Sequence, residues 1–278
     1  MQTAYWRKRI LSETLDKAER GNNSAYPPPD NGNGATDMLR LKIADVFDSA
    51  TKAKDRSQGE VDLWVRTLPD LMTLTGRIVA CDPFYCADTS TFTVEAPAGQ
   101  YPVMLSMAHF SHTGDERISA AMLRIADAPA IRWELAVCER DRNDESEMDD
   151  NEQEPLEVYT YCVDSGFASF MDVAAIDVIL DRVDVILDRV EEVNAENDDD
   201  FYEDAGDYLQ RRLEALHPMG GAEWFNIPLD DPHGTNILIF TSGWGDGAYW
   251  SYWGFGGQGS PVCLITDFGV LDEADLIE

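Results

Sequence analysis

The placement of acidic residues constrains this 278-residue chain more than any other sequence feature. Between Glu139 and Asp207 there are 25 acidic residues and four arginines, a net charge of −21 within the −32 of the whole chain. Outside this stretch the sequence has the tryptophans, glycine turns and β-branched runs of an ordinary folded protein. So concentrated an acidic field repels nucleic acids and membrane surfaces and attracts basic proteins over long distances. The charge therefore indicates a basic protein as partner.

The composition predicts a folded, soluble protein of the cytoplasm. A hydrophobic fraction of 44% and seven tryptophans exclude a wholly disordered chain. No apolar run follows the basic residues of the N-terminus as in a signal peptide, and the longest apolar stretches are too short to span a bilayer. The five cysteines are scattered, odd in number and without a C-x-x-C pair, which favours buried free thiols over a disulfide or metal site.

The charge pattern also divides the chain at about residue 60. Every lysine lies before residue 55, and the remainder is strongly acidic. We predict an N-terminal helical element over residues 1–60, with helices at Tyr5–Arg20 and Asp37–Lys54 separated by a Pro/Gly loop. Residues 61–278 are predicted to form an acidic, β-rich main domain. An acidic insert over residues 139–157 is predicted to be a solvated loop.

Short runs bounded by Gly, Pro or Asp predict an antiparallel sheet in the main domain. They are Leu74–Ala80, Thr91–Glu95, Pro102–Met107, Ile118–Ile125, Ile131–Cys138 and Val158–Val163. Three later runs, separated by the glycine-rich segments GWGDGA and FGGQGS, predict a three-stranded meander over Asn236–Ser242, Tyr249–Gly254 and Val262–Phe268. The fold class expected is α+β: a predominantly antiparallel β main domain with an N-terminal helical hairpin and an inserted amphipathic helical region.

That helical region, residues 173–216, contains the tandem repeat DVILDRV-DVILDRV at Asp177–Val190. The seven-residue period places one set of side chains on a single helix face and leaves most of the aspartates on the polar side. The apolar set is Ile179, Val183, Ile186, Val190 and Val193. Two heptads are too few to indicate a coiled coil, so a helix packed on the core is favoured over a dimer seam.

No complete catalytic signature is present, and no cofactor or metal is predicted. Aspartates in the most distinctive motifs offer the alternative of an enzyme, since clustered carboxylates can hold a divalent cation or exchange protons. Asp82, Asp164 and Asp246 are the candidate catalytic residues of that alternative, and Asp172 and Asp267 belong to the same group. The competing interpretation is that each aspartate caps a turn or a strand end. His109 and His112 have a spacing that could ligate zinc on a helix, but their Thr-Gly-Asp context favours a turn.

Several motifs in a fixed order resemble one known family. They are GRIVACDPF (Gly76–Phe84), GQYPVMLSMA (Gly99–Ala108), RISAAMLRI (Arg117–Ile125), RWELA (Arg132–Ala136), YCVDSGFASFMD (Tyr161–Asp172) and the C-terminal SGWGDG, YWG and TDFGVL. Over residues 76–271 the chain resembles the bacterial domain-of-unknown-function family 4241. The resemblance implies a common β-rich fold but no established reaction. Family members encoded near toxin and secretion genes imply an immunity role in competition between bacteria.

Charge and resemblance together predict an immunity protein that binds and neutralises a cognate basic toxin, with a nuclease as the favoured class. A nuclease attracts a polyanion, so its active site is cationic and clustered carboxylates can occupy it. The predicted contact residues lie in two acidic loops: Asp144, Glu145, Glu147, Asp149, Asp150, Glu152, Glu154, Asp198, Asp199, Asp200, Glu203 and Asp204. The alternatives are a metal-dependent hydrolase using Asp82, Asp164 and Asp246, and a generic acidic binding module.

Overall fold

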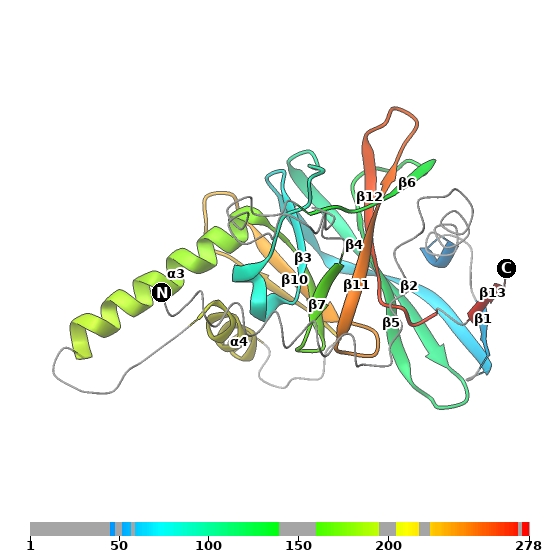
Figure 1. Ribbon diagram of the computed structural model, residues 1–278, viewed down its shortest axis with the longest axis horizontal. Helices are drawn as coiled ribbons and strands as arrows, with labels where there is room; N and C mark the ends of the chain where they lie inside the picture. Colours follow the sequence, from blue (N-terminus) through cyan, green and yellow to red (C-terminus); the bar gives the residue numbers. More distant parts are fainter. Residues whose placement is uncertain are drawn as a thin grey trace, which may run out of the picture.

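The computed structural model (Figure 1) describes residues 45–47, 52–56, 59–138, 160–194, 204–216, 223–271 and 274–277. These residues form two sheets whose paired strands all run antiparallel, together with a few helices. The expected α+β, β-rich class is therefore confirmed. Residues 1–44, which include most of the predicted N-terminal hairpin, lie outside the described part, and residues 45–47 are helical.

The larger sheet has the strand order β13-β1-β2-β4-β5-β12-β11-β6, with β7 also paired to β11. Its strands are β1 (Lys52–Asp55), β2 (Gly59–Leu74), β4 (Gly99–Phe110), β5 (Glu116–Arg124), β6 (Arg132–Leu135), β7 (Thr160–Val163), β11 (Gly247–Phe255), β12 (Pro261–Asp267) and β13 (Ala274–Ile277). The smaller sheet has the order β3-β8-β10-β9, formed by β3 (Ile78–Cys81), β8 (Phe167–Asp172), β10 (Asn236–Thr241) and β9 (Trp224–Pro228).

Burial patterns along the strands follow from their positions in these sheets. β3 is buried at every residue and β10 at all but its last, which suits short β-branched and aromatic runs with both faces covered. The first residues of β2 alternate between exposed and buried side chains, as expected for a strand with one solvated face. Edge-to-face packing of Phe170 on Phe240, with ring centroids 5.3 Å apart, fills the core between β8 and β10.

The long strand β2 connects the two sheets. Its register shifts between Thr67 and Leu71, and its second half contacts β8 and β10 of the smaller sheet. The buried Asn236 amide donates to the Leu71 carbonyl over 3.0 Å, while its oxygen accepts from the Thr73 N–H over 2.9 Å. A β-bulge bends a strand, and here the bend lets one strand take part in both layers.

Two α-helices, α3 (Val173–Asn194) and α4 (Ala205–Leu216), lie on the side of the smaller sheet (Figure 1). α3 begins directly after β8 and extends away from the sheets, and α4 packs against η1 (Pro83–Asp88). Ile179 and Val183 of the tandem repeat are buried, whereas Asp181 and Asp184 are exposed. The predicted core-packed face is thus confirmed for the first of the two heptads. No helix in the described part of the chain is long and apolar enough to cross a membrane.

Three sequence-based predictions of secondary structure were wrong. The helix expected to reach Lys54 does not, because Lys52–Asp55 forms β1, which pairs with β2 and β13. Thr91–Glu95 makes only an isolated bridge, between Phe92 and Cys138. The run Leu74–Ala80 is broken between β2 and β3, where the Asp172 carboxylate accepts from the backbone N–H groups of Thr75 and Gly76.

The predicted C-terminal meander was also wrong. β11 and β12 form a hairpin in the larger sheet, but β10 pairs with β8 and β9 in the smaller sheet. The GWGDGA segment is therefore a crossing between sheets. A glycine-rich turn determines the local chain reversal, whereas the pairing of each strand depends on distant residues.

Candidate functional site

The candidate site is centred on Tyr85 in the short helix η1. Asp82 is its N-cap, and its carboxylate Oδ1 accepts from the Phe84 N–H over 3.0 Å, with Pro83 in the first turn. Asp followed by Pro is a typical helix start, since proline needs no hydrogen-bond partner there. Phe84 packs on Phe167, at 6.2 Å between centroids, and the adjacent Tyr85 is 52% exposed.

Asp82 also fastens a second loop to η1. Its other carboxylate oxygen, Oδ2, accepts from the N–H groups of Asp164 and Ser165 over 3.0 and 2.9 Å. Asp82 is 1% exposed, so three backbone donors compensate a buried carboxylate. This arrangement brings the exposed side chain of Asp164, in the turn between β7 and β8, to the side of η1.

Asp204 reaches the site from the start of α4. Its carboxylate accepts from the Asp207 N–H over 2.9 Å, and the Asp207 carboxylate accepts in return from the Asp204 N–H over 3.4 Å. This reciprocal arrangement is a capping box, which defines the helix start. Gly206 permits the close approach of α4 to η1, because a Cβ built there would lie 2.5 Å from the Phe84 carbonyl oxygen.

We expect Gly206→Ala to destabilise the protein by about 1–3 kcal/mol through this backbone clash. The better helix propensity of alanine stabilises the variant by at most about 1 kcal/mol. The clash is therefore expected to dominate, and the net change in stability is a loss. Chemical denaturation measures the effect, and Glu214→Ala on the exposed face of α4 is the control. An equally stable Gly206→Ala variant would contradict the described contact between α4 and η1.

Asp246 belongs to the turn that leads from β10 to β11. The Ser242 N–H donates to the Gly166 carbonyl over 3.1 Å, which packs this turn against the turn that carries Asp164. The Tyr249 hydroxyl donates to the Ser242 carbonyl over 3.0 Å, and the Ser242 hydroxyl donates to the Gly245 carbonyl over 2.8 Å. The exposed Asp246 side chain is thus presented by a turn that is hydrogen-bonded on several sides.

These four aspartates act electrostatically on one hydroxyl group. Partial burial raises the pKa of Tyr85 most, and the negative charges of Asp164, Asp82, Asp204 and Asp246 raise it further. Each carboxylate opposes the formation of a fifth negative charge. The Tyr85 hydroxyl therefore stays a neutral hydrogen-bond donor at pH values above the usual pKa of tyrosine. We call Tyr85 and these four aspartates the Tyr85 cluster. An exposed aromatic ring among carboxylates suits a cationic group, which gains from both charge and ring face.

The three candidate catalytic residues of the enzyme alternative lie in segments that are hydrogen-bonded to one another, but they have different roles. Asp82 is buried and occupied by backbone donors, whereas Asp164 and Asp246 are exposed. Within the described residues, no group of three or more His, Cys, Asp and Glu side chains is arranged to hold a metal ion. The capping interpretation is confirmed for Asp82 and also for Asp172, which accepts from the Ala174 N–H at the start of α3 over 2.8 Å.

Of the twelve predicted partner-binding residues, only Asp204 lies in the described part of the chain. The other eleven lie outside it: Asp144, Glu145, Glu147, Asp149, Asp150, Glu152, Glu154, Asp198, Asp199, Asp200 and Glu203. The segments that contain them join described elements at Cys138, Thr160, Asn194 and Asp204. Asp204 is therefore both a predicted partner-binding residue and a member of the Tyr85 cluster.

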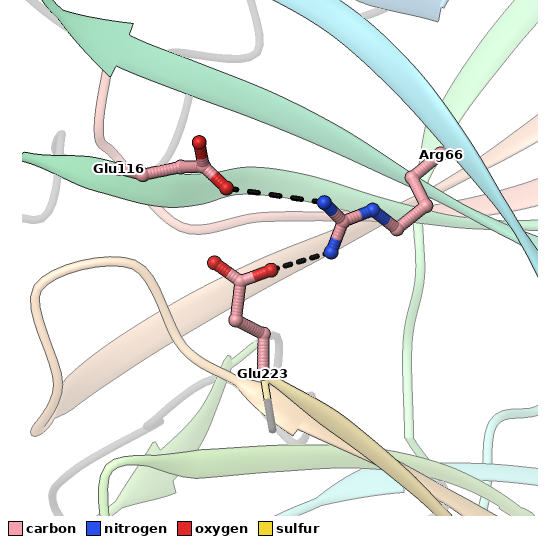
Figure 2. Close-up of polar contacts among 3 residues, drawn as sticks. All are labelled: Arg66, Glu116 and Glu223. Atoms are coloured by element: carbon pink, nitrogen blue, oxygen red, sulfur yellow. Dashed lines mark hydrogen bonds and ion pairs between the residues drawn. The ribbon is translucent and has the colours of Figure 1, made fainter. Parts of the chain in front are cut away.

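A partly exposed ion-pair network joins the sheets beside the start of β9. Figure 2 shows Arg66 of β2 between Glu116 of β5 and Glu223. The Arg66 guanidinium donates to the Glu223 carboxylate over 2.6 Å and lies 3.9 Å from that of Glu116. The Glu223 carbonyl oxygen in turn accepts from the Thr241 N–H over 2.9 Å, at the end of β10. This network therefore supports the chain where it enters the turn that carries Asp246.

Tyr85 was not among the site residues predicted from the sequence, although the sequence around it contains a signal. Asp82-Pro83 predicts a helical start immediately after a buried strand, and two aromatic residues follow in succession. Two successive residues point in different directions, so the rings of Phe84 and Tyr85 were expected to have different surroundings. The carboxylates near Tyr85 were not predictable, because their segments are far apart in sequence.

Comparison with known proteins identifies the family. No curated protein and no solved structure matches the chain significantly. The sequence model of a family described as "Protein of unknown function (DUF4241)" matches residues 71–266. This range covers more than two thirds of the 278 residues and contains η1, both sheets' central strands and the whole Tyr85 cluster. The chain belongs to the DUF4241 family.

Proposed function

We propose that this protein is a cytoplasmic immunity protein, an antitoxin that binds and neutralises a cognate basic toxin in competition between bacteria. The favoured toxin class is a nuclease, because a surface that attracts nucleic acid is also complementary to clustered carboxylates. The observation that carries the proposal is the Tyr85 cluster, in which an exposed ring lies within electrostatic reach of the carboxylates of Asp82, Asp164, Asp204 and Asp246.

Charge supports the proposal in two ways, by long-range attraction of the partner and by ion pairing at the contact. The net charge of −32 steers a basic partner from afar and speeds its encounter, but it is screened beyond a Debye length of about 10 Å at 0.1 M salt. At contact, the exposed aspartates of the cluster, Asp164, Asp204 and Asp246, can pair with arginine or lysine side chains near Tyr85. Tyrosine is enriched among the residues that contribute most to binding, which suits Tyr85 as a central anchor.

The test is the binding of purified protein to the basic product of the neighbouring gene, measured by stopped-flow kinetics. We expect the association rate constant to fall at least about tenfold between about 0.05 M and about 0.5 M salt, because steering is screened. Protection of cells that express the toxin is the matched functional assay. A toxin that does not bind, or that binds at a rate independent of salt, would contradict the proposal.

A second experiment tests the contribution of the two acidic loops apart from that of the Tyr85 cluster. Their acidic residues at positions 144–154 and 198–203 are replaced by the corresponding amides, while the Tyr85 cluster is kept. We expect a slower association, because these residues contribute much of the long-range field. Unchanged kinetics and protection would remove the loops from the proposed mechanism and leave the Tyr85 cluster as the contact.

A further inference from the structure

Trp244 is a large exposed side chain in the turn that carries Asp246 of the Tyr85 cluster. It is 42% exposed, although burial of a large aromatic side chain is normally strongly favourable. Trp244 lies two residues from Asp246, so the two Cα atoms are at most about 7 Å apart. A typical protein interface covers about 800 Å² on each partner, which is wide enough to include both side chains.

The side chain of Trp244 is ordered by contacts with other residues of the protein. It packs on the buried Phe110 at the end of β4, with centroids 5.4 Å apart. The Arg117 guanidinium of β5 lies 5.1 Å from the ring centroid, within the range of a cation–π contact. These contacts restrict the side chain before any partner arrives. A side chain that is already ordered loses less conformational entropy on binding.

The backbone that presents Trp244 is equally restricted. Gly243 has φ of +56°, and a Cβ at this position would lie 2.7 Å from Val270 and 2.8 Å from Phe268. The Gly245 N–H donates to the Ser242 carbonyl over 2.8 Å and closes the turn around Trp244. The turn is therefore packed too tightly for an ordinary side chain at position 243. Its shape displays the tryptophan instead of burying it.

We infer that Trp244 is a second anchor for the same basic partner, adjoining the Tyr85 cluster. The inference rests on the proposed function. The partner would cover the Trp244 ring with an apolar surface and place cationic groups against Asp246 and Asp164. Charge complementarity supports this occupant, since the turn that carries Trp244 also carries Asp246 and packs on the turn of Asp164. Tryptophan is enriched among the residues that contribute most to binding, and the loss of an interface contact changes mainly the dissociation rate.

The experiment compares Trp244→Ala, Trp244→Phe and Ile131→Ala in binding to the basic product of the neighbouring gene. Ile131 is 69% exposed before β6 and serves as the control for loss of an exposed apolar side chain. We expect Trp244→Ala to raise the dissociation rate constant about 10–100-fold and to leave the salt dependence of association unchanged. Trp244→Phe should retain most of the lifetime, and Ile131→Ala should match the wild type.

A nona-lysine peptide is the probe for charge, because its strongly hydrated ammonium groups stack on aromatic rings less than guanidinium groups do. It should bind wild type and Trp244→Ala with nearly equal affinity, because the peptide offers cations without an apolar surface. Unchanged dissociation of the toxin from Trp244→Ala would overturn the inference and leave the proposed function intact. A wild-type protein that fails to bind the toxin at all would instead overturn the proposed function. A lower affinity of the peptide for Trp244→Ala than for the wild type would also overturn the inference. Equal thermal unfolding of the variants confirms that each is folded.

Discussion

Replacing Asp164, Asp204 and Asp246 together by asparagine is expected to slow association with the basic partner about tenfold or more at low salt. The substitution removes three exposed charges around Tyr85 and keeps the size of each side chain. Electrostatic steering raises association rates by about 10–1000-fold, and carboxylates at the contact act on the encounter at the shortest distance, where salt screens them least. Stopped-flow kinetics at several salt concentrations measures both the loss and the flatter salt dependence.

The matched control neutralises three other exposed aspartates, Asp177, Asp181 and Asp184 on α3. Both variants change the net charge by three, so a difference between them reports position rather than total charge. The pKa of Tyr85 gives an independent readout of the cluster. Since the charges of Asp164, Asp204 and Asp246 raise this pKa, we expect it to fall toward the usual value in the first variant alone. Equal association rates for the two variants would contradict a specific role of the cluster.

Asp172→Ala is expected to lower the free energy of unfolding by about 3–5 kcal/mol. Asp172 is fully buried at the end of β8, and its carboxylate accepts from Thr75 N–H over 2.7 Å and the Thr75 hydroxyl over 2.8 Å. It also accepts from Ala174 N–H over 2.8 Å at the start of α3. Alanine would leave these donors unsatisfied at a point that joins β8, α3 and the turn before β3.

Denaturant unfolding followed by circular dichroism measures the effect of Asp172→Ala. Asp177→Ala is the control, because Asp177 is exposed on the same helix and should change stability by less than about 0.5 kcal/mol. Asp172→Asn should be intermediate, since one amide oxygen can still accept whereas the amide nitrogen faces other donors. A loss below about 1 kcal/mol for Asp172→Ala would show that water or another group replaces the carboxylate.

Much of the local structure followed from residue patterns. The period of the tandem repeat predicted the buried positions Ile179 and Val183, because burial on a helix repeats with its turns. Asp before Pro at Asp82 predicted a cap, and the structure confirms it. Each of these predictions depends on residues within a few positions of one another.

Strand pairing was less predictable, and the C-terminal segment illustrates the reason. β10 and β11 are consecutive and separated by a glycine-rich turn, a pattern that is also typical of a hairpin. The structure places them in different sheets, because β10 pairs with β8 and β9 while β11 pairs with β12. A buried run can pair with several partners, and packing of the complete core decides among them.

The amino-acid sequence by itself determined the acidic character of this protein, its β-rich class and the amphipathic face of α3. Charge depends on composition, and the periodicity of buried residues is a local property of helices and strands. Only the tertiary structure placed Asp82, Asp164, Asp204 and Asp246 within electrostatic reach of Tyr85 and left Trp244, two residues from Asp246, exposed. The hydrogen bond from Asp164 N–H to Asp82 joins residues 82 positions apart. A contact at that separation forms because the two sheets pack together in the folded protein. Local sequence patterns do not predict it.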